Sequence, residues 1–298
     1  MKRLASICLV AAAAACSGPQ PPKDNVISKS ATLAAWTSNG KVVYTEEVDT
    51  GPVKHGVRLF SPSSGKSEEI AVVFGEPTFL DADDTDRILL GGVGGAFTIL
   101  QQDGTILHEV TVLSDVSGGY LGLHLAASGT KLALATQQTQ PDLQVHSVTD
   151  GSRLFEYPDV EGTAVIRELE WSAEDSFLYY SLGDSTGATP DAIRRVLSDS
   201  VSAPALVFQD AGIPRIDRLF LSSDGTTFVF SGEDADDEMG VWTIPASGGT
   251  AVRVAREDNR RLTVRAATGP SPDGQRFVLL SDTARGTRLT VEPLEAIE

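Results

Sequence analysis

The sequence predicts an all-β chain folded as a six-bladed β-propeller of four-stranded antiparallel blades. Two observations lead to this prediction. A cassette of a hydrophobic strand, a tight turn and a second hydrophobic strand occurs six times, with turns at positions 40, 84, 129, 175, 225 and 274. The steps between these turns are 44 to 50 residues, a period typical of propeller blades. In four units a second turn follows 20 to 25 residues after the first, which makes four strands per unit.

The first turn of each unit holds a residue that accepts the left-handed backbone region. In chain order these residues are Gly40, Asp84, Gly129, Asp175, Gly225 and Gly274. Tight hairpin turns need a positive φ, which glycine adopts without steric cost. Aspartate tolerates it better than most residues, so we interpret Asp175, and Asp199 at the second turn of the same unit, as drift of the repeat. The runs between turns are rich in β-branched and aromatic residues, which favour strands.

The sixth unit ends before its fourth strand. Its third strand is expected at residues 288–291, and Pro293 with five further residues completes the chain. Residues 25–28, just before the first cassette, have the length to supply the missing strand. Such pairing would close the ring and cover an exposed sheet edge, which favours it. We therefore assign residues 26–298 to the propeller.

The first 25 residues predict export and anchoring. Lys2 and Arg3 precede an apolar run at 4–15, which is too short to span a membrane and typical of a signal peptide. The run ends in Ala-Ala-Ala-Cys, which resembles the lipobox of bacterial lipoproteins and implies a signal peptide of residues 1–15 and acylation of Cys16. The alternative is ordinary cleavage after Ala15, which leaves a free thiol at the same cysteine.

Residues 16–25 are expected to form a proline-rich, extended tether for the lipid anchor. Ser17 follows the cysteine, and by resemblance to enteric lipoproteins the absence of Asp there implies the outer membrane. The expected location is the bacterial cell envelope, with the propeller on the periplasmic side of the outer membrane.

Two turns carry a family resemblance. Residues 222–225 (Ser-Ser-Asp-Gly) and 271–274 (Ser-Pro-Asp-Gly) look like the SPDG blade signature of TolB-type, WD-like propellers. The pairs at 36–37 (Trp-Thr) and 171–172 (Trp-Ser) match the aromatic residue and hydroxyl residue of that signature. The resemblance covers residues 30–293 and implies the propeller fold. It implies little about function, because the signature is a turn device. TolB also carries an α/β domain before its propeller, which this chain replaces with a short tether.

Composition excludes several kinds of function. The formal net charge is −17, so the chain repels nucleic acid and anionic membrane surfaces. Both cysteines, Cys8 and Cys16, lie near the N-terminus, so residues 26–298 hold neither a disulfide nor a thiolate metal site. We expect a monomer.

Strand alternation places the longer loops, between second and third strands and between blades, on one face. Function concentrates in loops on rigid scaffolds, so we expect a binding site on this long-loop face, unless the loops are merely tolerated insertions. The candidate binding residues are Asp184, Asp234, Asp236, Asp237 and Glu238.

The sequence predicts no catalytic residue, metal site or cofactor. Residues 183–187 match a Gly-x-Ser-x-Gly pattern, but every histidine precedes it, whereas a hydrolase triad of that kind needs a later one. The acidic runs at 81–86 and 233–238 lack the glycine and glutamate of a calcium loop, so we interpret them as solvated charge. The histidines occur at no metal-binding spacing, and we interpret His124 as a packing or surface residue.

These observations favour a non-catalytic lipoprotein whose propeller binds or scaffolds another protein or an envelope ligand. The alternative is a metal-dependent propeller hydrolase or lactonase, whose ligands would be scattered over several blades. An orphan sensor subunit of a larger complex is a third possibility that the sequence does not separate from the first.

Overall fold

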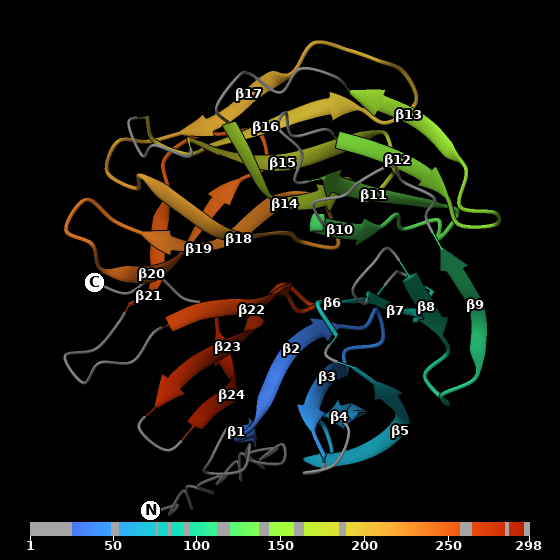
Figure 1. Cartoon of the computed structure of the whole chain (residues 1–298). Helices are drawn as coiled ribbons and strands as arrows, with labels where there is room; N and C mark the ends of the chain where they lie inside the picture. Colours follow the sequence, from blue (N-terminus) through green and yellow to red (C-terminus); the bar gives the residue numbers. More distant parts are fainter. Residues whose placement is uncertain are drawn as a thin grey trace, which may run out of the picture.

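The computed structural model describes residues 26–48, 54–75, 77–82, 85–91, 96–111, 120–136, 143–157, 164–184, 189–256, 264–283 and 286–294. In these ranges 24 strands form six four-stranded antiparallel sheets, without a helix. The sheets surround a central axis as a six-bladed β-propeller, which confirms the predicted fold (Figure 1).

Each of the first three blades contains four consecutive strands. Blade 1 comprises β2 (Ala31–Trp36), β3 (Val42–Glu47), β4 (Lys54–Ser61) and β5 (Lys66–Phe74); blade 2 comprises β6 (Phe79–Ala82), β7 (Ile88–Gly91), β8 (Ala96–Leu100) and β9 (Ile106–Thr111); blade 3 comprises β10 (Tyr120–Leu125), β11 (Lys131–Thr136), β12 (Leu143–Ser147) and β13 (Arg153–Tyr157).

The other three blades follow the same plan, except that the last one combines both ends of the chain. Blade 4 comprises β14 (Ala164–Trp171), β15 (Phe177–Asp184), β16 (Ala192–Leu197) and β17 (Ala205–Gln209); blade 5 comprises β18 (Arg215–Leu221), β19 (Thr227–Glu233), β20 (Met239–Pro245) and β21 (Val252–Arg256); blade 6 comprises β22 (Val264–Pro270), β23 (Arg276–Thr283), β24 (Gly286–Pro293) and β1 (Val26–Ser28).

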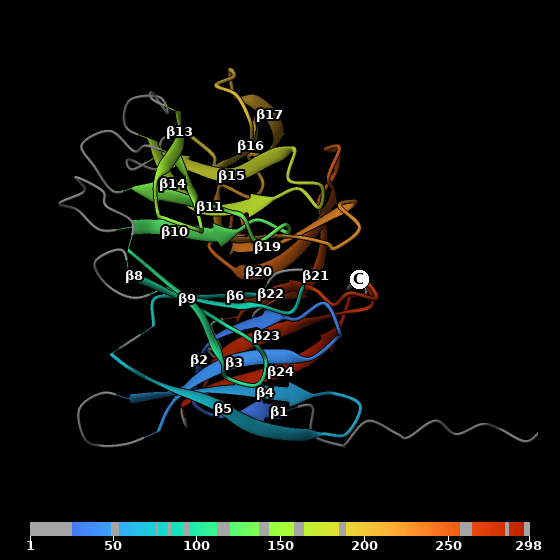
Figure 2. The same ribbon diagram turned by 90° about the vertical axis from the view of Figure 1, so that its right-hand side faces the viewer.

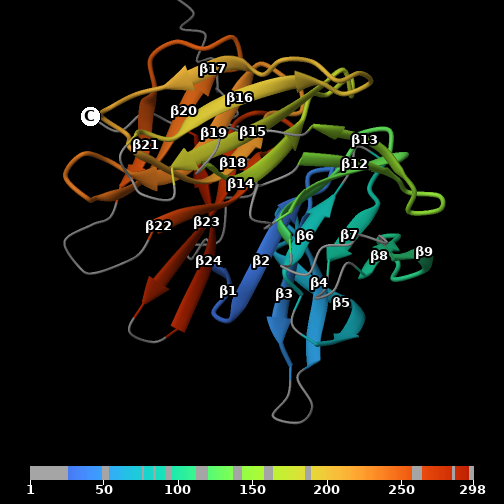
Figure 3. The ribbon, with the colours of Figure 1, turned by 45° about the horizontal axis from the view of Figure 1, so that its top comes forward.

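The ring closes through β1, as the sequence predicted. This short strand pairs antiparallel with β24, matching Val26 with Thr290 and Ser28 with Leu289. Figure 2 shows the ring from the side, and in Figure 3 the N-terminal β1 lies next to β24. The Ser28 hydroxyl also donates a hydrogen bond of 2.9 Å to Glu46 in blade 1. Closure therefore links the first and last parts of the propeller.

The core lies between blades rather than inside one. Six clusters of buried apolar side chains each combine residues of two neighbouring blades, one cluster for each junction of the ring. Trp36, Trp171 and Trp242 belong to three of these clusters. At the junction of blades 4 and 5, the rings of Trp242 and Phe230 stack with 5.8 Å between centroids. Burial of such surfaces is the main stabilising contribution, so each blade depends on its neighbours.

The first turns have the expected backbone. One residue in each lies at positive φ: Gly40, Asp86, Gly129, Asp175, Gly225 and Gly274, with φ between 53° and 77°. In blade 2 this residue is Asp86, two positions beyond the expected Asp84, which lies outside the described residues. The Ser222 hydroxyl accepts hydrogen bonds from the amides of Thr226 and Thr227, which fixes the turn of blade 5.

Asp175 is not drift, which corrects our interpretation of the sequence, and Asp86 at the turn of blade 2 makes contacts of the same kind. The Asp86 carboxylate accepts hydrogen bonds from the Ser38 hydroxyl (2.8 Å) and the Asn39 side-chain amide (2.9 Å) of blade 1. Asp175 of blade 4 contacts the first turn of blade 3 in a similar way. Aspartate therefore replaces glycine where its carboxylate ties one blade to the preceding one.

The predicted signal peptide (1–15), Cys16 and the tether (16–25) lie outside the described residues. The ranges that are described contain no helix long and apolar enough to cross a membrane.

Candidate functional site

The inner strands of the six blades (β2, β6, β10, β14, β18 and β22) surround a central channel. A cavity of about 160 Å³ lies in it, lined by residues of all six strands. Turn residues such as Ser38, Ala173 and Ser223 also line the cavity, so it lies toward the face that carries the tight turns. This is the end of the channel opposite the long-loop face.

Charged side chains occupy one layer of the channel wall. The second-to-last residue of each inner strand lies in this layer, and blades 2, 3 and 4 supply Asp81, His124 and Glu170 there. The equivalent residues of the other blades are Ala35, Phe220 and Gly269. One half of the layer is therefore ionic, and the other half holds small or apolar residues.

His124 lies between the two carboxylates of its layer. Its Nε2 is 3.0 Å from Glu170 Oε2, and its Nδ1 is 3.4 Å from Asp81 Oδ2. Burial disfavours a charge on the ring, but Asp81 and Glu170 outweigh it and raise the pKa of His124 to about 10. The side chain is therefore an imidazolium at neutral pH. This corrects the interpretation of Asp81 as merely solvated charge.

A second ion pair lies two residues earlier on the inner strands of blades 4 and 5. Arg218 Nη1 is 2.9 Å from Glu168 Oε1, and the pair joins blades 4 and 5. Burial raises the pKa of Glu168 to about 7, although Arg218 and His124 oppose the increase. Among the described groups, this carboxyl is one that changes its protonation state near neutral pH.

The carboxylates of this layer also contact the backbone of the next blade. The amide of Leu125 donates a hydrogen bond of 3.1 Å to Asp81, and the backbone of Leu221 opposes the rise that burial causes in the pKa of Glu170. The indole N–H of Trp171 donates a hydrogen bond of 3.0 Å to the carbonyl of His124. Inner strands are sheet edges, and their polar groups need partners. The ionic layer therefore holds blades 2 to 5 together.

The acidic loop at 234–238, which joins β19 and β20, has a defined backbone. Oδ1 of Asp234 accepts hydrogen bonds from the amides of Asp236 (2.9 Å) and Glu238 (3.0 Å). Its Oδ2 accepts one of 2.7 Å from Arg253 on β21. Asp234 thus holds the backbone of the loop, and the side chains of Asp236, Asp237 and Glu238 are exposed, with Glu238 3.8 Å from Arg253.

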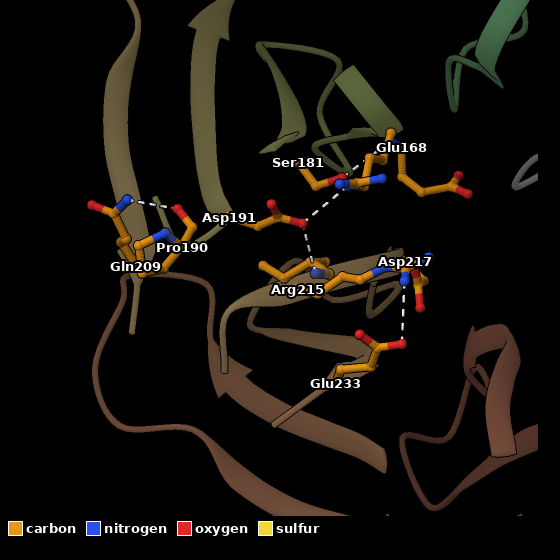
Figure 4. A network of polar contacts seen from close by, with 10 residues as sticks. Glu168, Ser181, Pro190, Asp191, Gln209, Arg215, Asp217 and Glu233 are labelled. Carbon is orange, nitrogen blue, oxygen red and sulfur yellow. Dashed lines mark hydrogen bonds and ion pairs between the residues drawn. The ribbon is translucent and has the colours of Figure 1, made fainter. Parts of the chain in front are cut away.

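A second polar network lies on the same long-loop face at blades 4 and 5 (Figure 4). Oδ2 of the buried Asp191 accepts hydrogen bonds from Arg167 Nε (3.0 Å) and from the amide of Ile216 (2.8 Å). Arg215 pairs with Asp217 at 2.7 Å and with Glu233 at 3.2 Å. These contacts fix the base of both loops.

Asp184 and the acidic loop lie on either side of the connection at 210–214. Asp184 ends β15, and its Oδ2 accepts a hydrogen bond of 3.4 Å from Thr189. The amide of Asp191 donates a hydrogen bond of 2.9 Å to the carbonyl of Pro214, and the amide of Ala235 donates one of 3.1 Å to the carbonyl of Gly212. The structure thus links the two loops that carry the predicted binding residues.

Sequence reasoning missed the ionic layer of the channel. Asp81, His124 and Glu170 are 43 and 46 residues apart, close to the blade period, and each precedes the last residue of its strand. Alignment of the repeats would have placed them in one layer. Taken singly, Asp81 belonged to an acidic run and His124 to a strand.

The described residues contain no group of three or more His, Cys, Asp or Glu side chains arranged to hold a metal ion. Asp81 and Glu170 contact opposite nitrogens of the imidazole, so the three groups do not converge on one point.

No protein-family profile matches the chain, and no curated protein sequence matches it. Solved structures do. A protein assigned as TolB from Agrobacterium tumefaciens is 14% identical, with a TM-score of 0.59 over 89% of this chain and 91% of that one. A gluconolactonase from Xanthomonas campestris is 14% identical, with a TM-score of 0.60 over 90% and 89%. An oligogalacturonate lyase in complex with manganese is 15% identical, with a TM-score of 0.56 over 88% of each chain.

The likeness is one of fold. At such identities the neighbours share a propeller with this chain, and they include enzymes as well as a TolB-type protein.

Proposed function

We propose that this chain is a lipoprotein of the bacterial cell envelope, and that its propeller binds another protein or an envelope ligand through the long-loop face. The proposed anchor is Cys16, on the periplasmic side of the outer membrane. The proposed binding residues are Asp236, Asp237 and Glu238, with Asp184 on the neighbouring loop. Asp234 holds the acidic loop in place.

The fixed acidic loop is the observation that supports this proposal best. Its backbone is held by Asp234 and Arg253, while three neighbouring carboxylates face solvent. A preorganised loop loses little conformational entropy on binding, and its charges attract a basic partner. The polar contacts of the channel, by contrast, already join one blade to the next.

Site-specific photo-crosslinking in the native envelope tests the proposal. A photoreactive residue replaces Asp236 on the long-loop face, or Ser64 in the tight turn of blade 1 as a control, because both positions are exposed. We expect a discrete protein adduct from position 236 alone. An unlabelled double variant, Asp236→Ser with Asp237→Ser, is then added as a competitor of the photoreactive protein. If the carboxylates recognise the partner by their charge, this variant should compete poorly. No adduct from position 236, or equal adducts from both positions, contradicts the proposal.

The second candidate is a propeller hydrolase or lactonase. The gluconolactonase and the manganese-bound lyase among the structural neighbours favour it, as does a channel carboxyl with a pKa near neutrality. The described donors do not converge on a metal position, so a metal-dependent form lacks support from these residues. Stoichiometric metal in the purified protein together with lactone hydrolysis would favour this candidate.

A further inference from the structure

The chain enters the propeller on the side of the tight turns. Strand β24 is the third strand of blade 6, so it runs from the long-loop face toward the tight-turn face and ends at Pro293. β1 pairs antiparallel with it, with Val26 opposite Thr290, and therefore runs the other way. Its last residue, Ser28, bonds to Glu46 near the long-loop end of β3. Val26, the first residue of β1, is thus the one nearer the tight-turn face.

The length of chain between Val26 and the proposed anchor limits how the propeller can turn. Residues 16–25 separate the two, and an extended chain of ten residues spans about 31 Å. The eight residues of β24 make the blade about 26 Å high. To bring the long-loop face to a bilayer, the chain would spend most of its length running back along the blade. The tight-turn face can approach the bilayer without this cost in length.

Charge favours the same orientation. The tight turns of blades 1 and 6, which lie nearest to β1, carry the three cations Lys41, Lys66 and Arg276. Among the described residues of these turns the single carboxylate is Asp273, which pairs with Arg276 at 3.1 Å. The acidic loop at 234–238 presents three exposed carboxylates at the opposite face. Anionic head groups attract lysines and repel carboxylates that come within about 10 Å of them.

We infer that the anchored chain turns its tight-turn face to the membrane and holds the acidic loop away from it. This inference rests on the anchor of the proposed function, Cys16, and deepens that function. The partner of the long-loop face then approaches from the aqueous side. It is a protein with a basic surface rather than a lipid head group of the anchoring membrane.

Energy transfer between the propeller and a bilayer tests this orientation. The chain without residues 1–15 keeps the 24 described strands and has Cys16 as its single thiol. That thiol is coupled to a maleimide phospholipid in vesicles of phosphatidylethanolamine and phosphatidylglycerol with an acceptor dye on their head groups. A fluorescent amino acid replaces Ser64 at the tight-turn face or Asp236 at the long-loop face. Both positions are exposed and belong to blades next to blade 6, so they differ in the face that carries them.

We expect transfer from position 64 to exceed transfer from position 236 about twofold, because the two faces differ in height by about 26 Å. A control variant, Cys16→Ser with Glu238→Cys, moves the lipid to the acidic loop and should reverse the order. Equal transfer from both positions, or stronger transfer from position 236, in the chain coupled at Cys16 overturns the inference.

This outcome is separate from that of the proposed function. The lipid is attached chemically, so the result in vesicles does not depend on whether cells acylate Cys16, which labelling with palmitate measures. The class of partner has its own test in the crosslinking at position 236. An adduct with lipid instead of protein there would contradict a partner that approaches from the aqueous side.

Discussion

The carboxylate of Asp175 in blade 4 accepts a hydrogen bond of 2.9 Å from the backbone amide of Ser128 in blade 3. Its other oxygen accepts a hydrogen bond of 2.8 Å from the backbone amide of Ala127. Asp175 itself lies at φ 53°, a conformation that non-glycine residues avoid. The contact explains why aspartate stands there, because glycine would relax the backbone and lose both hydrogen bonds.

Replacing Asp175 with glycine therefore separates backbone strain from the link between blades. We expect Asp175→Gly to lower the free energy of unfolding by about 1–3 kcal/mol, because two charge-assisted hydrogen bonds outweigh the relief at positive φ. Urea unfolding measures this change, with Glu174→Ala at the exposed neighbouring position as the control. A glycine variant as stable as the unaltered chain would show that the link contributes nothing.

The closing strand β1 yields a second prediction. Deletion of residues 1–29 removes β1, leaves blade 6 with three strands and exposes the edge of β24. We expect the melting temperature to fall by roughly 5–10 °C and oligomers to form through the open edge. Deletion of residues 1–24 retains β1 and is the matched control. Thermal melting and size-exclusion chromatography compare the two, and identical behaviour would mean that closure by β1 is dispensable.

Acylation of Cys16 is testable because the chain offers a second cysteine as a control. Cells that express the chain are grown with radiolabelled palmitate. We expect the label to enter the unaltered protein and Cys8→Ala, but not Cys16→Ala, because residue 8 lies within the predicted signal peptide. Failure of the unaltered protein to incorporate label, or label retained by Cys16→Ala, would leave the chain without the proposed anchor.

The sequence was sufficient for the fold because the propeller repeats its turn chemistry. Gly40, Gly129, Gly225 and Gly274 all lie at positive φ, as their spacing predicted. The pairing of β1 with β24 could be predicted because the sixth unit lacks a fourth strand and residues 25–28 precede the first cassette. The turn of blade 2 was misplaced because no glycine marks it, and what selects Asp86 is a contact with blade 1 that local sequence does not contain.

The site was less predictable because its contacts cross between blades. The pairing of His124 with Glu170 depends on how two inner strands approach each other, which no spacing within one blade encodes. Only alignment of the blades places both residues in one layer. The sequence shows the acidic loop as a cluster of charges. It does not show that Asp234 holds the loop while Asp236 faces solvent, because that difference depends on the contact of Asp234 with Arg253.

The imidazolium of His124 should make stability depend on pH in alkaline solution. The pKa of His124 is about 10 in the folded chain against 6.5 for an unperturbed histidine, because Asp81 and Glu170 flank the buried ring. A pKa raised by folding contributes stability that is fully present below pH 6.5 and is lost as the pH rises through 10. His124→Gln lacks this contribution, so its stability should change less between pH 6.5 and 10 than that of the unaltered chain.

Urea unfolding at a series of pH values measures this difference. The control is His108→Gln, because His108 is exposed on β9 and lies outside the ionic layer. Glu168 acts at lower pH. Burial raises its pKa from the ordinary 4.5 to about 7, so the stability that its protonated form contributes is lost as the pH rises from 4.5 to 7. The two groups thus act in adjacent pH ranges. If His124→Gln and His108→Gln gave the same profile above pH 7, the paired imidazolium would have no part in holding blades 2, 3 and 4 together.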